Sequence, residues 1–145
     1  MRVSVKTLLI VMVTLSFASG NPCRADWADK DQYAIDKWTN DRLEKAKCTA
    51  DETGCWDEAY KKWDQELNTE YKRLMALLTP AQQKNLVASE IQWLKYRDAE
   101  LKLIDDVYGH TSGSMYASAQ AASRVRILRD RVILLKHYIE LIKGL

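Results

Sequence analysis

The sequence has few of the residues on which several fold classes depend. Its 145 residues include only five glycines, two prolines, three cysteines and one phenylalanine. So few glycines and prolines exclude a collagen-like or linker-like chain, and they disfavour a β-sandwich, which needs many turns. Hydrophobic residues make up 47% and charged residues 29%. The chain can therefore bury the core of one domain, and it is not a disordered tail.

A secretory signal peptide is predicted over the first 25 residues. A basic head of Arg2 and Lys6 precedes an apolar run, 7–17, that is shorter than the roughly 20 residues of a membrane-spanning helix. We expect cleavage after Ala25, with a cut after Gly20 as the alternative. The mature chain is then periplasmic or secreted, with no membrane span.

Cleavage changes the charge and the expected class of partner. The loss of three basic residues leaves 19 of the 22 against 20 acidic ones, so residues 26–145 carry a net charge of −1. A near-neutral exported domain lacks the electrostatic footprint of a nucleic-acid-binding protein. We therefore predict a single domain with a protein partner and no nucleic-acid partner.

Two cysteines, Cys48 and Cys55, remain after cleavage at Ala25. In an exported protein such an even number is expected to pair as a disulfide. Because only six residues separate the two cysteines, the closed loop is short and would add about 2 kcal/mol to the free energy of unfolding. Cleavage after Gly20 would also keep Cys23, as a spare thiol or a competing partner.

The sequence offers little on which catalysis or metal binding could rest. His110 and His137 are isolated, and they lie too far along the chain from Cys48 and Cys55 for a zinc-binding spacing. There is no glycine-rich phosphate loop and no serine in a nucleophile elbow. We therefore predict no metal, no cofactor and no enzymatic activity.

Apolar residues repeat at helical spacing along most of the mature chain. Helices are predicted over 31–47, 56–78, 80–108 and 115–143. Short connections make successive helices antiparallel neighbours. The expected fold is all-α, an antiparallel up-and-down bundle of three long helices plus one short N-terminal helix. The expected buried stripe of the second helix is Trp56, Tyr60, Trp63, Leu67, Tyr71, Leu74 and Leu78, and that of the third is Val87, Ile91, Leu94, Leu101, Ile104 and Tyr108.

The connections between these helices differ in kind. The segment 48–54 is expected to be a turn that the disulfide pins. Thr79 is expected to cap the third helix, with Pro80 at its first position and Gln82 completing a capping box. A loop is predicted for the last connection, which contains two glycines and three hydroxyl residues: Gly109, His110, Thr111, Ser112, Gly113 and Ser114.

Charged residues on the long helices suggest links within the bundle. Asp64 and Arg97 are expected to tie the second helix to the third. Four basic residues of the last helix are expected to pair with acidic residues of adjacent helices, and a patch for an anionic partner is the alternative interpretation. These residues are Arg124, Arg126, Arg129 and Arg131.

Two motifs in the second and third predicted helices carry a family resemblance. The residues form a structural signature: Asp64, Leu67, Asn68 and Tyr71 after Cys55, then Trp93, Arg97 and Asp98. Together they resemble the lysozyme inhibitor LprI-like family of small exported bacterial proteins, over roughly residues 48–135. The chain departs from that family's pattern: the spacing of Cys48 and Cys55 is shorter than usual, and 117–123 contains no cysteine where one would be expected. Glu90 stands where a glutamine is usual, and Leu101 stands where a cysteine is frequent.

The resemblance implies an α-helical periplasmic or envelope protein and, from one branch of the family, inhibition of lysozyme. Lysozyme or another muramidase is then the expected partner. An inhibitor must block a sugar-binding cleft that presents two carboxylates. The loop 109–114 could enter such a cleft, where His110 or Ser112 could hydrogen-bond the catalytic acids. An ordinary helix connection is the alternative for this loop, and a structural or adaptor role in the envelope is the alternative function.

Overall fold

The computed structural model describes residues 33–111, 113 and 115–144. The predicted signal peptide, its two cleavage sites and Cys23 lie outside the described residues. So do Ser112 and Ser114 of the predicted loop.

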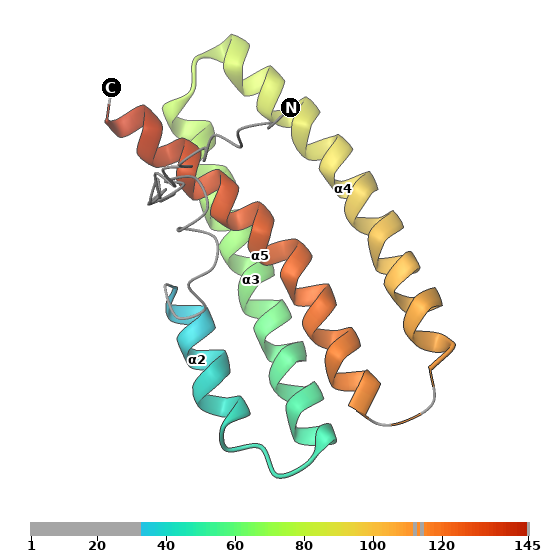
Figure 1. Ribbon diagram of the computed structural model, residues 1–145. Coiled ribbons are helices and arrows are strands. Elements are labelled where there is room, and N and C mark those ends of the chain that lie inside the picture. Colours follow the sequence, from blue (N-terminus) through green and yellow to red (C-terminus); the bar gives the residue numbers. More distant parts are fainter. Residues whose placement is uncertain (1–32, 112, 114, 145) are drawn as a thin grey trace, which may run out of the picture.

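The described residues form three long helices and one short one (Figure 1). These are α2 (Ala34–Leu43), α3 (Thr49–Leu77), α4 (Pro80–Gly109) and α5 (Met115–Lys143). Successive long helices run antiparallel, and α2 lies beside α3 (Figure 1). The predicted all-α bundle is confirmed. The α2–α3 turn and the α4–α5 loop lie at one end of the bundle, and the α3–α4 turn lies at the other.

The hydrophobic core lies mainly between α3 and α5, which pack along most of their lengths. The predicted stripe of α3 is confirmed at its centre, where Trp63, Leu67 and Leu74 are buried, and its remaining residues are partly buried against the same core. The α5 side of the core is made of branched aliphatic side chains at helical spacing, Val125, Leu128, Val132, Leu135 and Ile139.

The short helix α2 is attached to this pair by apolar packing, ring contacts and ion pairs. The rings of Tyr33 and Trp63 meet edge to face, with 6.0 Å between their centroids. The guanidinium of Arg129 donates hydrogen bonds of 2.8–3.0 Å to the carboxylate of Asp36. The Asp36 hydrogen bonds raise the pKa of Arg129, although its partial burial acts in the opposite direction.

The predicted turn over 48–54 is wrong, because α3 already begins at Thr49. Asp51 and Glu52 lie in the first helical turn, where acidic side chains favour a helix through its dipole. The backbone N–H of Lys47 donates to the Asp51 carboxylate at 3.0 Å. The polar composition that indicated a turn is therefore that of a helix start.

The predicted disulfide is also wrong, since Cys48 and Cys55 are free thiols in the structure. Cys48 is the N-cap of α3, and Cys55 lies seven residues further along the same helix. At 1.5 Å per residue this places their Cα atoms roughly 10 Å apart along the axis. A disulfide requires less than about 7 Å, so the helix itself keeps the two sulfur atoms apart.

The start of α4 agrees with the prediction, but its buried face does not. The N–H of Thr79 donates to the Gln82 side chain at 2.9 Å, and the Gln82 N–H donates to the Thr79 hydroxyl at 3.5 Å, which is the predicted capping box. Of the helix residues, all of which are described, only Leu86 is buried. Three residues predicted to be buried are exposed instead: Val87, Ile91 and Leu94.

In the first half of α4, the predicted buried face differs from the observed one by about one residue around the helix. The side that faces α5 runs through Leu86, Glu90 and Trp93 rather than through Val87, Ile91 and Leu94. A shift of one position turns a helix face by about 100°. Nearer the end of α4, the predicted residues Leu101, Ile104 and Tyr108 continue the side that faces α5, and they are partly buried.

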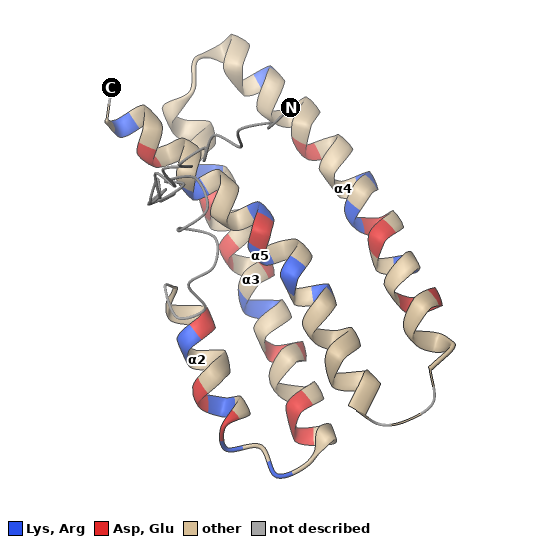
Figure 2. Ribbon diagram, viewed as in Figure 1, with Lys and Arg blue, Asp and Glu red and all other residues tan. Residues whose placement is uncertain are grey.

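The charged residues are spread over the helices, with the exception of the first two turns of α5 (Figure 2). That segment, 115–123, contains no charged residue. Within the described residues, no helix combines the length and the apolar character that crossing a membrane requires.

Candidate functional site

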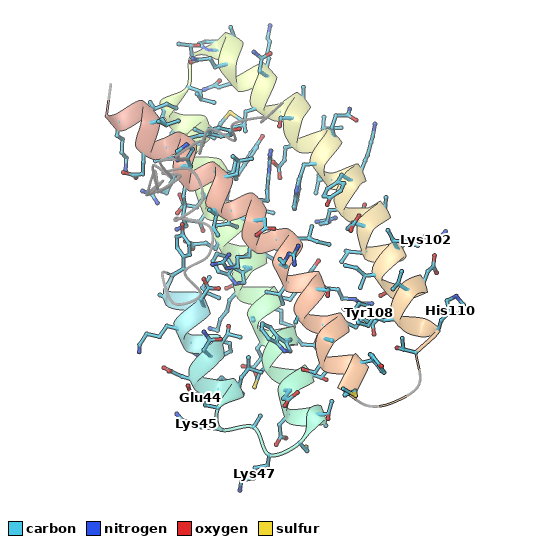
Figure 3. All side chains as sticks on the ribbon, in the orientation of Figure 1. Glu44, Lys45, Lys47, Lys102, Tyr108 and His110 are labelled. Atoms are coloured by element: carbon cyan, nitrogen blue, oxygen red, sulfur yellow. The ribbon has the colours of Figure 1, made fainter. Side chains whose placement is uncertain are left out.

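The connection between α4 and α5 forms one end of the bundle, and it contains the predicted partner-binding residues. We define the α4–α5 tip as His110, Thr111, Gly113, Met115 and Tyr116. Gly109 is the last residue of α4, and His110 is its C-cap. The side chain of His110 is exposed and points away from the bundle (Figure 3).

Local hydrogen bonds fix the backbone of the α4–α5 tip. The N–H and the hydroxyl of Thr111 both donate to the carbonyl of Tyr108, at 3.0 and 2.6 Å. The N–H of Tyr116 donates to the carbonyl of Gly113 at 3.2 Å. Gly113 has a φ of +128°, a conformation that strains other residues. The tip thus has a glycine-specific backbone turn.

Polar contacts between α4 and α5 support the base of the tip. Arg124 of α5 forms an ion pair with Asp105 of α4, which also accepts a hydrogen bond from Gln120 at 2.9 Å. The hydrogen bond from Arg124 lowers the pKa of Asp105 the most, and the one from Gln120 lowers it further. The hydroxyl groups of Tyr108 and Ser123 are 3.1 Å apart. The base is therefore organised before any partner binds.

Apolar side chains stand around the polar tip. The side chain of Met115 is 70% exposed, and Val107 and Tyr116 are also exposed. Methionine and tyrosine are enriched at protein interfaces, where their large side chains become buried. With a hydrogen-bonding imidazole beside these groups, the tip has the chemical make-up of a protein-binding surface.

A hollow of about 480 Å³ lies between α4 and α5. It is lined by Trp93 and Tyr96 of α4 and by Arg126 and Asp130 of α5, among others. Burial raises the pKa of Asp130. The two walls of this hollow lie on different helices, so the spacing of residues along the chain does not define it.

The residues of the family signature have structural contacts. Leu67 is buried in the core and Tyr71 packs against it. The side-chain amide of Asn68 donates to the backbone carbonyl of Asp64 at 2.8 Å. The guanidinium groups of Arg97 and Arg131 lie 5.6 and 5.7 Å from the centre of the Trp93 ring. Asp98 accepts hydrogen bonds from Arg97 at 2.7–2.9 Å.

The predicted tie between α3 and α4 through Asp64 and Arg97 is wrong. Arg97 pairs with its own neighbour, Asp98, and α4 packs against α5 rather than α3. The links between α4 and the rest of the bundle come instead from side chains of α5, among them Arg124 and the more deeply buried Arg131. Arg131 donates to Glu90 at 2.7 Å and to Ser89 at 3.2 Å.

Three of the four arginines of α5 pair with acidic residues of other helices, as predicted. These pairs are Arg124 to Asp105, Arg129 to Asp36 and Arg131 to Glu90, and Arg126 lies 4.0 Å from Asp130 on α5 itself. The alternative of a basic patch for an anionic partner has no support from these pairings.

A buried charge cluster between α3 and α5 was not predicted. Glu70 is almost fully buried and accepts hydrogen bonds from Arg73 at 2.7 Å and from Lys136 at 3.1 Å. Lys136 also donates to Glu66. Burial lowers the pKa of Lys136, but the hydrogen bonds to Glu66 and Glu70 and the negative charges of these two groups together raise it, so the net shift is upward. Among the described residues, no group of His, Cys, Asp and Glu is arranged to hold a metal ion.

Comparison with known proteins agrees with the signature residues. The sequence model of the family described as lysozyme inhibitor LprI matches residues 40–135, from within α2 to within α5. No curated protein and no solved structure gave a significant match. The matched range covers about two thirds of the chain and includes the α4–α5 tip. The chain therefore belongs to the LprI lysozyme inhibitor family.

Proposed function

We propose that this chain is an exported inhibitor of a lysozyme-like, peptidoglycan-cleaving enzyme, and that it binds through the α4–α5 tip. The observation that carries the proposal is the family match over residues 40–135, since that family is named for inhibition of lysozyme rather than for an enzymatic activity. The tip lies within the matched range. The predicted signal peptide supports export, because lysozyme substrates lie outside the cytoplasm.

The chemistry of the tip suits the cleft of such an enzyme. Glycoside hydrolases of this kind present two carboxyl groups, one on each side of the scissile bond. The imidazole of His110 carries an N–H that can donate to a carboxylate, and its side chain is exposed at the end of α4 (Figure 3). Met115 and Tyr116 would cover the apolar parts of the cleft rim.

Long-range electrostatics contribute little to this proposal. With the predicted net charge of −1 after cleavage, the domain has no strong field with which to attract a basic enzyme. Affinity would then depend on short-range contacts at the tip, and the association rate would change only modestly with salt.

The test uses the purified secreted protein, a small panel of muramidases, and the turbidity of a cell-wall suspension. Excess protein is expected to slow lysis by at least one enzyme. His110→Ala is expected to weaken inhibition about tenfold or more, because it removes a charge-assisted hydrogen bond. His137→Ala is the matched control, since His137 is the other histidine of the chain and is exposed on α5. Met115→Ala tests the apolar part of the tip. Its matched control is Leu141→Ala, because Leu141 is also exposed and lies near the opposite end of α5.

Two results would count against the proposal, each against a different part. Unchanged lysis with every enzyme at excess protein contradicts inhibition and favours the structural or adaptor role. Inhibition that is equally strong in His110→Ala, Met115→Ala and the control variants contradicts binding through the tip.

A further inference from the structure

An exposed stripe on α4 is separate from the α4–α5 tip. We define the α4 stripe as Lys84, Val87, Ile91, Leu94 and Asp98, which follow one another at steps of 3, 4, 3 and 4 residues and therefore share one side of the helix. The three apolar side chains are 41%, 48% and 37% exposed. Lys84 and Asp98 are exposed at the two ends.

Packing within the chain does not account for this stripe. The side of α4 that contacts α5 passes through Leu86, Glu90 and Trp93, about one residue around the helix. In Figure 1, α4 lies at the margin of the bundle, with the other three helices on one side of it. Neighbouring exposed apolar side chains on a helix are typical of a protein-binding surface.

The order of the residues indicates the partner. Ile91 is the centre of the stripe, with one apolar residue on either side and a charge of opposite sign seven residues away in each direction. When two copies of the stripe cross antiparallel at Ile91, Val87 meets Leu94 of the second copy and Lys84 meets Asp98 of the second copy. A two-fold axis repeats both contacts. A parallel arrangement would instead place like charges together, which is unfavourable.

We propose that the α4 stripe is a self-association surface, and that its occupant is a second copy of this chain bound antiparallel. Asp98 is available for the contact, because its hydrogen bonds from Arg97 reach one oxygen, Oδ1, and the side chain remains largely exposed. The stripe spans 14 residues, or roughly 20 Å of helix. A contact of this size falls at the small end of specific interfaces, so the dimer is expected to dissociate in the micromolar range.

Charge reversal provides the test. The purified protein is studied by analytical ultracentrifugation up to about 100 µM chain, which spans the expected dissociation constant. The wild type is expected to form dimers, and Lys84→Glu and Asp98→Lys are each expected to weaken them at least about tenfold. Each substitution turns both symmetric ion pairs into like-charge contacts. Lys72→Glu makes the same change of charge at an exposed position of α3 and is the matched control.

Complementation makes the test specific to the antiparallel pairing. In an equimolar mixture of the Lys84→Glu and Asp98→Lys chains, every charged contact of the mixed dimer is attractive again, so dimers should return. The double variant Lys84→Glu/Asp98→Lys should dimerise by itself for the same reason. Far-ultraviolet circular dichroism confirms that each variant keeps its helices.

The proposal is overturned by a wild type that stays monomeric over the whole range, by single variants that dimerise like the wild type, or by a mixture that fails to associate. It is also overturned when Lys72→Glu weakens the dimer as much as Lys84→Glu does. The stripe lies within α4 and the tip lies beyond its end, so inhibition of a muramidase by a strictly monomeric protein would contradict this proposal alone.

Discussion

The helices α3 and α4 have almost the same length, 29 and 30 residues, but they are buried to very different extents. The structure describes both helices completely. In α3 six residues are buried, and the helix packs against both α2 and α5. In α4 only Leu86 is buried, and the helix packs mainly against α5.

The difference shows that apolar content does not determine burial. The apolar residues of α3 lie on one broad side, where α5 and α2 together cover most of them. Those of α4 are divided between the side facing α5 and the α4 stripe. Besides the apolar contacts of Leu86 and Trp93, α4 is attached by polar links, of which the contact from Arg131 to Glu90 is the most buried.

The largest expected effect compares one leucine from each helix. Leu67→Ala in α3 removes a side chain that is 6% exposed, and it should lower the free energy of unfolding by about 2–5 kcal/mol. Leu94→Ala in α4 removes an exposed side chain and should cost less than about 1 kcal/mol. Urea denaturation of dilute protein measures both. Equal losses would show that α4 is packed as tightly as α3.

A smaller effect is expected from the polar attachment of α4. Arg131→Met removes the hydrogen bonds to Glu90 and Ser89 and should cost about 2 kcal/mol. Amide hydrogen exchange should become faster in α4 and remain slow in α3. The control is Arg126→Met, whose partner lies 4.0 Å away and whose side chain is exposed, so a change below about 0.5 kcal/mol is expected. Unchanged exchange in α4 would mean that Arg131 does not hold this helix.

The smallest effect is a pH dependence at the α3–α5 interface. The folded-state pKa of Lys136 is raised above its ordinary value of 10.5, so its contribution to stability is fully present below that pH. The contribution is lost as the pH rises through the folded-state pKa. The difference in unfolding free energy between the wild type and Lys136→Met should therefore shrink above pH 10.5. A difference that stays constant up to denaturation would contradict the role of the charge.

Local features of this fold could be predicted from the sequence, and features that depend on distant residues could not. The capping box of Thr79 and Gln82 needs only neighbouring residues, so it was found. The acidic start of α3 is also local, but its polar composition near Gly54 was interpreted as a turn. The buried face of α4 depends on where α5 docks, and periodicity alone cannot give that orientation.

The same distinction applies to the candidate site. The loop between α4 and α5 was predicted from its glycines and hydroxyl residues, and the signature motif led to the family that the comparison confirmed. The sequence predicted that the α5 arginines pair with acidic residues, but it did not identify which acidic residues these are. Glu70 was missed because its partner Lys136 lies 66 residues away, and a single acidic residue on a helix gives no sign of burial.

The short link between α3 and α4 fixes one end of α4, so a rotation of α4 about this junction would displace its other end the most. Only Leu78 and Thr79 separate the two helices, and the side chain of Gln83 clamps the junction by donating to the carbonyls of Met75 and Leu78 at 3.0 and 3.1 Å. A helix of 30 residues is about 45 Å long, so a swing of about 10° about this pivot would carry the far end through about 8 Å. The residues around Ile91 would travel only about 3 Å. The end that carries His110 therefore has the greatest reach for the smallest angular change.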